Sequence, residues 1–180
     1  MTEPREVTEF WSAAGRERWF RRDDTFDAEF RAHFLDAHFA AARREREAWL
    51  DDAEGALAML LLLDQFPRNA FRGSGHSFAT DGLARYYADR VIAAGLDAEI
   101  PALLRAFVYL PFEHSEALAD QDRAVALFTA LGDAEYLRYA QAHRDVIARF
   151  GRFPHRNRVL GRVSTPDEQG WLDAGGGFGG

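Results

Sequence analysis

Apolar residues recur three and four positions apart along nearly the whole chain, and this spacing limits the fold more than any other feature. Phe26, Phe30 and Phe34, followed by Ala37 and Ala41, are one clear example. Such spacing places the apolar side chains on a single face of a helix. No pair of alternating, strand-like runs is joined by an Asn-Gly or Asp-Gly turn. The sequence therefore predicts an all-α protein.

The helical runs are short and follow one another closely, which predicts antiparallel helical hairpins. The stretch from residue 132 to 154, G-D-A-E-Y-L-R-Y-A-Q-A-H-R-D-V-I-A-R-F-G-R-F-P, resembles the second half of a tetratricopeptide repeat. No clean period of about 34 residues runs through the chain, so the pattern fits either a tetratricopeptide-like right-handed superhelix or an irregular bundle of about 7–8 helices. We expect helices near 6–13, 26–47, 51–66, 79–94, 98–110, 114–131 and 134–150, and a short one from about 165.

Local signals predict where several of these helices begin or end. A residue that precedes proline avoids the helical region, so we expect one helix to end at Phe66 and another to be closed by Pro111. Gly151 is a natural helix stop. Thr165 is placed to cap the last helix, because a glutamate stands three residues after it.

The length and the apolar runs bound the class of protein. A chain of 180 residues is most economically one domain. We assign residues 1–173 to it and expect residues 174–180 to form a flexible, Gly-rich tail. The longest apolar run covers residues 56–63, whereas a membrane helix needs about 18 residues. The N-terminus lacks the basic start and apolar core of a signal peptide. We therefore expect a soluble cytoplasmic protein without membrane contact.

Two missing residue types exclude several kinds of chemistry. The chain has no cysteine, which excludes disulfides, thiolate nucleophiles and cysteine-bound zinc. It has no lysine either, which excludes a lysine Schiff base and a phosphate-loop lysine. The net charge of −7 argues against general nucleic-acid binding.

The first of three polar clusters follows the apolar run and contains Asp64, Gln65, Arg68, Asn69 and Arg72. On one reading the two arginines satisfy the last carbonyls of the helix and the asparagine starts a turn. On the other reading the five side chains form a network, because polar groups beside a buried helix need partners.

The second cluster begins at Glu113, His114 and Glu116 and continues to Asp120 and Gln121. Carboxylate and imidazole groups together can perform acid–base chemistry or bind a metal. On a helix starting at about 114, the three acids share one face, whereas the histidine and the glutamine share another. We therefore assign no metal ligands here. The alternative is that a helix N-terminus attracts the acids.

The third cluster lies between residues 143 and 162. His143 stands within a helical run, and Arg152, His155, Arg156 and Asn157 surround the Phe-Pro step that follows it, with Arg162 further on. Arginine forms bidentate bonds with carboxylates and phosphates. These arginines can therefore pair with acids of the protein, hold a small anionic ligand, or face solvent.

The motifs L-L-L-D-Q-F-P-R-N-A-F-R-G, F-A-T-D, Y-L-P-F-E-H-S-E and F-G-R-F-P-H-R-N resemble a mainly bacterial family called "domain of unknown function 924", over about residues 7 to 173. The resemblance implies an all-α, tetratricopeptide-like fold and no established activity. The family's signature positions in this chain are polar or charged: Asp64, Gln65, Arg68, Asn69, Arg72, Asp81, Glu113, His114, Glu116, Gln121, His143, Arg152, His155, Arg156, Asn157, Arg162 and Thr165.

Two functions fit these observations. In the first, the polar residues form a pocket that binds a small anionic molecule and performs acid–base catalysis; whether a cofactor takes part is unknown from the sequence. In the second, a helical scaffold binds a protein or peptide, and the polar network only fixes the fold. For the first function the candidate catalytic residues are Glu113, His114, Glu116 and His143, and the candidate ligand-binding residues are Asp64, Gln65, Arg68, Asn69, Arg72, Arg152, His155, Arg156, Asn157 and Arg162.

Overall fold

The computed structural model describes residues 2–178, and this part of the chain is helical without strands. The predicted all-α class is therefore confirmed. The α-helices are α1 (Pro4–Ala14), α2 (Arg16–Trp19), α3 (Asp24–Ala42), α4 (Ala53–Leu60), α5 (Phe66–Ala70), α6 (Asp81–Ala93), α7 (Ala102–Glu113), α8 (Leu118–Leu131), α9 (Ala134–Phe150) and α10 (Pro166–Asp173). Four 3-10 helices, η1 (Glu47–Asp51), η3 (Gly75–Phe78), η4 (Leu96–Glu99) and η5 (Pro154–Arg156), and a π-helix, η2 (Leu61–Gln65), connect them.

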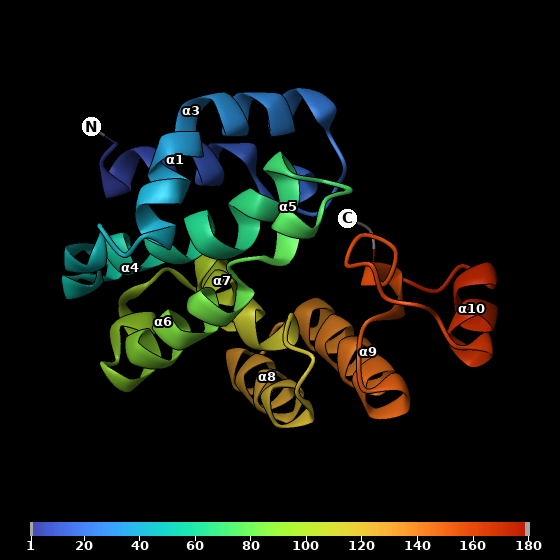
Figure 1. Ribbon diagram of the computed structural model, residues 1–180. Coiled ribbons are helices and arrows are strands. Elements are labelled where there is room, and N and C mark those ends of the chain that lie inside the picture. The colour runs from blue at the N-terminus through green and yellow to red at the C-terminus, as the bar shows by residue number, and fades with distance from the viewer. Residues whose placement is uncertain (1, 179–180) are drawn as a thin grey trace.

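Consecutive helices pack side by side around a central segment. The helices α1 and α3 cover α4, η2 and α5, while α6, α7, α8 and α9 follow on the other side (Figure 1). Residues 56–63 are almost fully buried, as their uniformly apolar sequence predicts. Aromatic rings fill the core on the N-terminal side, where Trp11 stacks on Trp19 and meets Phe107 edge-on.

Several helix ends follow local rules. The helix α9 covers Ala134–Phe150 as predicted, and Gly151 ends it in the left-handed conformation at φ 69°. Thr165 caps α10 in the predicted capping box, in which its hydroxyl accepts from the Glu168 N–H. The long helix α3 ends at Ala42, five residues earlier than expected, and Arg44 then takes a positive φ of 63°.

The predicted helix ends at the two prolines are wrong. Phe66 keeps helical angles (φ −53°, ψ −50°), and α5 continues through Pro67 to Ala70. The helix α7 likewise passes through Pro111 and ends two residues later at Glu113. Pro67 is accommodated because Leu61–Gln65 form a π-helix just before Phe66, whose N–H bonds to the Leu61 carbonyl. Pro67 then occupies the first turn of α5, where its missing N–H has no cost.

Three side chains donate hydrogen bonds to carbonyls of the π-helix. His38 Nδ1 lies 2.8 Å from the Leu62 oxygen, and because a carbonyl can only accept, Nδ1 carries the proton. The Thr80 hydroxyl donates to the Leu63 oxygen at 2.5 Å. Arg68 donates to the Asp64 oxygen at 2.7 Å. The π-helix is therefore held in place by tertiary contacts.

The chain breaks its helix after α7, which changes the second polar cluster. Glu113 is the last residue of α7, Glu116 lies in the loop that follows, and α8 begins only at Leu118. The predicted helix over 114–131 therefore starts four residues later than expected, although it ends at Leu131 as predicted, and the three acids do not share one helical face. The Ser115 hydroxyl stabilises the loop by accepting from the Ala117 N–H at 3.2 Å and donating to Asp120 at 2.6 Å.

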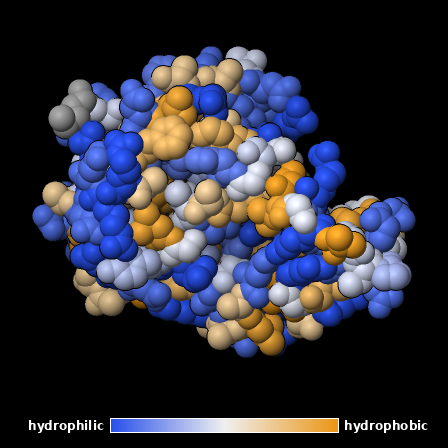
Figure 2. Space-filling view, viewed as in Figure 1, coloured by the Kyte–Doolittle hydropathy of each residue, from blue (hydrophilic) through white to orange (hydrophobic). Residues whose placement is uncertain are grey.

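The C-terminal segment projects from the body and carries α10, which packs mainly on η5 (Figure 1). Arg152 ties α10 to the end of α9 by two hydrogen bonds to Glu168, at 2.6 and 2.8 Å. Beyond α10, the Phe178 ring stacks on His143 at 3.5 Å. Hydrophilic residues cover most of the face shown in Figure 2, and hydrophobic residues form smaller separate areas there. Within residues 2–178 there is no helix with the length and apolarity needed to cross a membrane.

Candidate functional site

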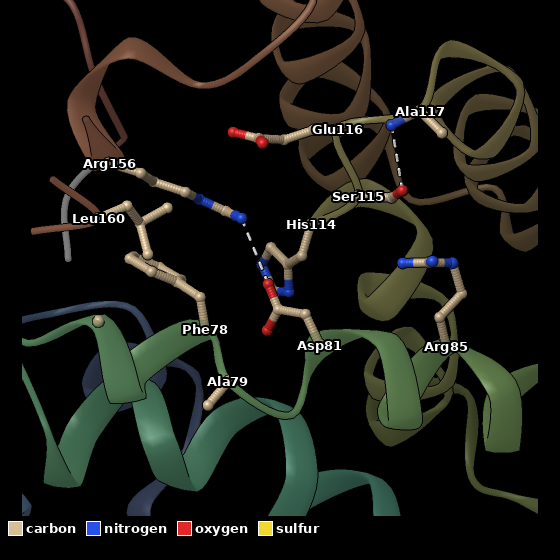
Figure 3. Close-up of a pocket in the computed structure, with 11 residues that line it drawn as sticks. Phe78, Ala79, Asp81, Arg85, His114, Ser115, Glu116, Ala117, Arg156 and Leu160 are labelled. Carbon is tan, nitrogen blue, oxygen red and sulfur yellow. Dashed lines mark hydrogen bonds and ion pairs between the residues drawn. The ribbon is translucent and has the colours of Figure 1, made fainter. Parts of the chain in front are cut away.

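A pocket of about 470 Å³ lies where three segments of the chain meet. It is lined by residues of η3 and the start of α6, by the loop 114–117, and by Arg156 with Leu160 of the C-terminal segment. In Figure 3 the His114 ring lies in the middle of this group, with Arg156 on one side and Arg85 on the other. The volume is in the range of sites that hold small molecules.

A buried carboxylate fixes the His114 ring at this pocket. Asp64 is completely buried in the π-helix, and its Oδ1 lies 2.8 Å from His114 Nδ1. Burial opposes ionisation of Asp64, but the charge of Arg68 and the contact with His114 outweigh it and lower its pKa to about 2. An ionised carboxylate only accepts hydrogen bonds, so His114 Nδ1 carries the proton. Its Nε2 is then unprotonated and carries a lone pair, and it has no hydrogen-bond partner in the part of the chain that the structure describes.

At neutral pH the His114 imidazole is in its uncharged, basic form. Burial lowers the pKa of His114 from its usual 6.5, and the nearby Arg68 charge lowers it further, against the opposing effect of Asp64. The imidazole is therefore neutral near pH 7, with a lone pair available at Nε2.

Arg68 joins Asp64 to Asp81 behind the pocket. Its two terminal nitrogens donate to the Asp81 carboxylate at 2.8 and 3.0 Å, and one of them also lies 3.1 Å from Asp64 Oδ1. Gln65 completes the group by donating to Asp64 Oδ2 at 2.7 Å. All four side chains satisfy one another, which fixes the position of Asp64.

Arg156 has fewer hydrogen-bond and charge partners than Arg68. Its side chain is 7% exposed, and its guanidinium carbon lies over the rings of Phe78 and Phe153, at 4.4 and 4.5 Å from their centroids. Its one carboxylate contact is a 3.3 Å bond to Asp81, which already binds Arg68 at shorter range. Its Nε is buried without a hydrogen-bond partner among residues 2–178. Burial and the like charge of Arg68 lower its pKa to about 10. Arg156 is thus a buried cation with too little counter-charge.

A second carboxylate–imidazole pair lies beside the first. Glu113 Oε1 is 3.1 Å from His143 Nδ1, which also lies 2.8 Å from the Tyr139 carbonyl. Burial and the negative charge of Asp64 raise the pKa of Glu113 to about 8, and burial lowers the pKa of His143 to about 3. The pair is therefore a contact between neutral groups at pH 7, not an ion pair. The rings of His114 and His143 are 6.4 Å apart.

The remaining predicted residues of the C-terminal segment bind one another or the loop after α7. Arg162 forms two hydrogen bonds with Glu116, at 2.7 and 2.9 Å. Glu116 also accepts from the Phe153 N–H, and it lines the pocket. Asn157 bonds to Arg162, Ser164 and Glu168. His155 is partly buried beside Phe153, and burial lowers its pKa to about 4.

Asn69 and Arg72 belong to a different contact. Both donate to Asp27 of α3, Asn69 at 2.7 Å and Arg72 at 2.5 Å. This contact joins α3 to α5, and neither residue lines the pocket. Of the predicted residues, His114, Glu116 and Arg156 line the pocket directly, while Asp64, Gln65, Arg68, Glu113 and His143 lie in the networks behind them.

Sequence reasoning missed the aromatic and apolar walls and assigned Asp81 no site role. Asp81 and Phe78 both stand in the F-A-T-D motif, so the motif carried the signal. Arg85, Ala117 and Leu160 carry no comparable signal, because only the packing of distant segments brings them to the pocket. Across residues 2–178 no three histidine or acidic side chains are grouped to hold a metal ion.

Comparisons with known proteins identify the family of the chain. A family model described as a bacterial protein of unknown function, DUF924, matches residues 7–176. The chain belongs to this family. A relative of solved structure, a protein of unknown function from Agrobacterium tumefaciens, is 51% identical. The match covers 95% of this chain and 97% of the other, with a TM-score of 0.92. A search of the curated proteins finds no match.

Proposed function

We propose that the pocket binds a small anionic organic molecule and that His114 acts on it as a general base. The Asp64–His114 hydrogen bond carries this proposal, because it leaves Nε2 unprotonated at the pocket. A positioned imidazole held by a carboxylate is a recurrent acid–base device in enzymes. The action takes place in the cytoplasm, as the sequence leads us to expect.

Arg156 supports the anionic character of the ligand. Its desolvated charge is poorly compensated by Asp81, so an additional negative group in the pocket stabilises it. Two aromatic rings pack against its guanidinium, whose N–H groups point outward in its own plane. Arg156 therefore orients the ligand, and His114 Nε2 accepts a proton from it.

A thermal-shift screen of organic acids, phosphorylated metabolites and nucleotides tests binding. A ligand at a hundredfold excess over its Kd stabilises the protein by about 2.7 kcal/mol. Ala117 is exposed and lines the pocket, so Ala117→Trp fills the pocket without touching the buried network. Ala119 is exposed two residues later but does not line the pocket, which makes Ala119→Trp the matched control. We expect hits that Ala117→Trp abolishes and Ala119→Trp retains. A screen without such hits contradicts the proposed binding.

Turnover of a hit tests the role of His114. His114→Asn keeps a polar side chain but removes the basic Nε2, so we expect the ligand to bind and its conversion to stop. Undiminished turnover in this variant would remove His114 from the mechanism. Conversion is followed by NMR of the ligand, which detects a product of any structure.

The alternative is a tetratricopeptide-like scaffold that binds a protein or peptide. Pairs within the protein, Arg72–Asp27, Arg152–Glu168 and Arg162–Glu116, favour a structural role for these three arginines, because they require no ligand. On this alternative the pocket is unused, and Ala117→Trp changes no binding property of the protein.

A further inference from the structure

We infer that the ligand of this pocket is a singly charged carboxylic acid with an apolar or aromatic body, not a phosphate or another polyanion. This inference rests on the proposed function and specifies its substrate class. The charge around the pocket, the geometry of Arg156 and the apolar walls lead to it independently.

The charged groups around the pocket balance one another. Each ionised acid at or behind the pocket has an arginine partner: Asp81 with Arg68, Glu116 with Arg162, and Asp120 with Arg85. Asp64 and Arg156 add one further charge of each sign to the set. A monoanion therefore adds one negative charge beside the undersupplied Arg156. A dianion adds two negative charges to this balanced set, and desolvating the second charge is a further cost.

The geometry of Arg156 favours a planar acid. A guanidinium donates its hydrogen bonds in its own plane, and the rings of Phe78 and Phe153 pack against that of Arg156. Nη1 binds Asp81, and Nη2 has no hydrogen-bond partner in the described part of the chain. A carboxylate matches this in-plane approach. Phosphate sites usually add backbone N–H groups at a helix N-terminus, but at the start of α6 an acid, Asp81, lines the pocket.

The walls of the pocket favour an apolar body. Phe78, Ala79 and Ala117 line it together with Leu160, which is 39% exposed at this surface. Figure 3 shows Phe78 and Leu160 beside the Arg156 side chain, on the side of the pocket away from Arg85. A ligand whose acid group binds Arg156 therefore places its hydrocarbon part against these side chains and buries apolar area.

Three matched probes test the inference: benzoate, its neutral analogue benzamide, and phenyl phosphate. Their affinities for the full chain are measured by isothermal titration calorimetry at pH 7.5, in wild type, Ala117→Trp and Ala119→Trp. We expect benzoate to bind about tenfold more tightly than either other probe, since only it provides a single charge in a planar group. We expect Ala117→Trp to abolish this binding and Ala119→Trp to retain it. Ala79→Trp, at a second exposed position on the pocket wall, repeats the test should Ala117→Trp unfold.

The outcomes distinguish the carboxylic-acid ligand from the more general proposal of anion binding. Pocket-dependent binding of phenyl phosphate that equals or exceeds that of benzoate overturns the carboxylic-acid inference, while anion binding stands. Equal binding of benzamide and benzoate overturns both, because the negative charge then contributes nothing. Benzoate binding that survives both pocket-filling variants, or no binding of any probe, also overturns both.

Discussion

At the scale of single residues, two sequence neighbours, Glu113 and His114, have opposite protonation behaviour. Burial is the main cause in both cases: it raises the pKa of the carboxyl group to about 8 and lowers that of the imidazole. Burial disfavours the charged form, which is the anion for Glu113 and the cation for His114. Near pH 7 one residue is therefore a protonated acid and its neighbour an unprotonated base. Groups separated in this way serve as acid and base in many enzymes.

Glu113→Gln tests the protonation of the buried acid. A raised pKa in the folded state stabilises the protein fully below the unfolded value of about 4.3, and this contribution is lost as pH rises through about 8. We expect the stability of wild type relative to Glu113→Gln to fall between pH 5 and pH 8, by up to about 1.4 kcal/mol per pH unit. Urea unfolding at several pH values measures this difference. A difference that does not vary with pH contradicts the assignment, and Glu99→Gln, at an exposed position, is the control.

The tautomer of His114 gives a second test at this scale. We expect proton-detected ¹⁵N NMR to find Nδ1 protonated and Nε2 unprotonated, with a titration midpoint below the usual 6.5. In Asp64→Asn the ring loses its anionic acceptor, so the preference for this tautomer weakens. Protonation at Nε2 in the wild type would be incompatible with the proposed base.

At the scale of helices, the sequence predicts a helix end correctly where a few consecutive residues determine it. Gly151 and Thr165 act as expected, because a left-handed glycine and a capping box depend on a few consecutive residues. Pro67 and Pro111 do not, because the helices pass through them. The carbonyls near Pro67 bind His38 and Thr80, which are distant in sequence. No local pattern in the chain provides these donors.

Thr80→Val tests whether such a donor stabilises the π-helix. The substitution keeps the shape of the side chain but leaves the Leu63 carbonyl without its hydroxyl donor. We expect a loss of about 1–3 kcal/mol in the free energy of unfolding, which is the usual cost of an unsatisfied buried acceptor. Thr80→Ser retains the hydroxyl and is the matched control. Equal stability of Thr80→Val and wild type, measured by urea unfolding, would show that the carbonyl finds another donor.

At the scale of the whole molecule, the polar signature divides into separate groups. The sequence predicts the polar residues, but it treats Asp64, Gln65, Arg68, Asn69 and Arg72 as one cluster, whereas Asn69 and Arg72 bind Asp27 of α3. It does not predict that Arg156 reaches Asp81, because that contact depends on how the C-terminal segment packs on α6.

Arg72→Ala separates the fold from the site. Loss of its hydrogen bonds to Asp27 weakens the contact between α3 and α5 and leaves a poorly compensated carboxylate. We expect a lower Tm, with a cost of about 1–3 kcal/mol, and an unchanged Kd for pocket ligands. Ala117→Trp should show the reverse, with a Tm near that of wild type and no binding. A large loss of affinity in a folded Arg72→Ala protein would mean that the two groups are coupled.

The π-helix also makes the site dependent on the number of residues in the chain. Shortening the segment Leu61–Gln65 by one residue would restore regular α-helical winding at this point. A π-helix closes its hydrogen bonds over five residues instead of four, so restoring α-helical winding would change the directions of the side chains within the segment, including that of Asp64. Asp64 would then lose its direction toward His114, although every residue around the pocket would be retained. In this part of the protein the number of residues in the helix is as important to the site as the identity of its side chains.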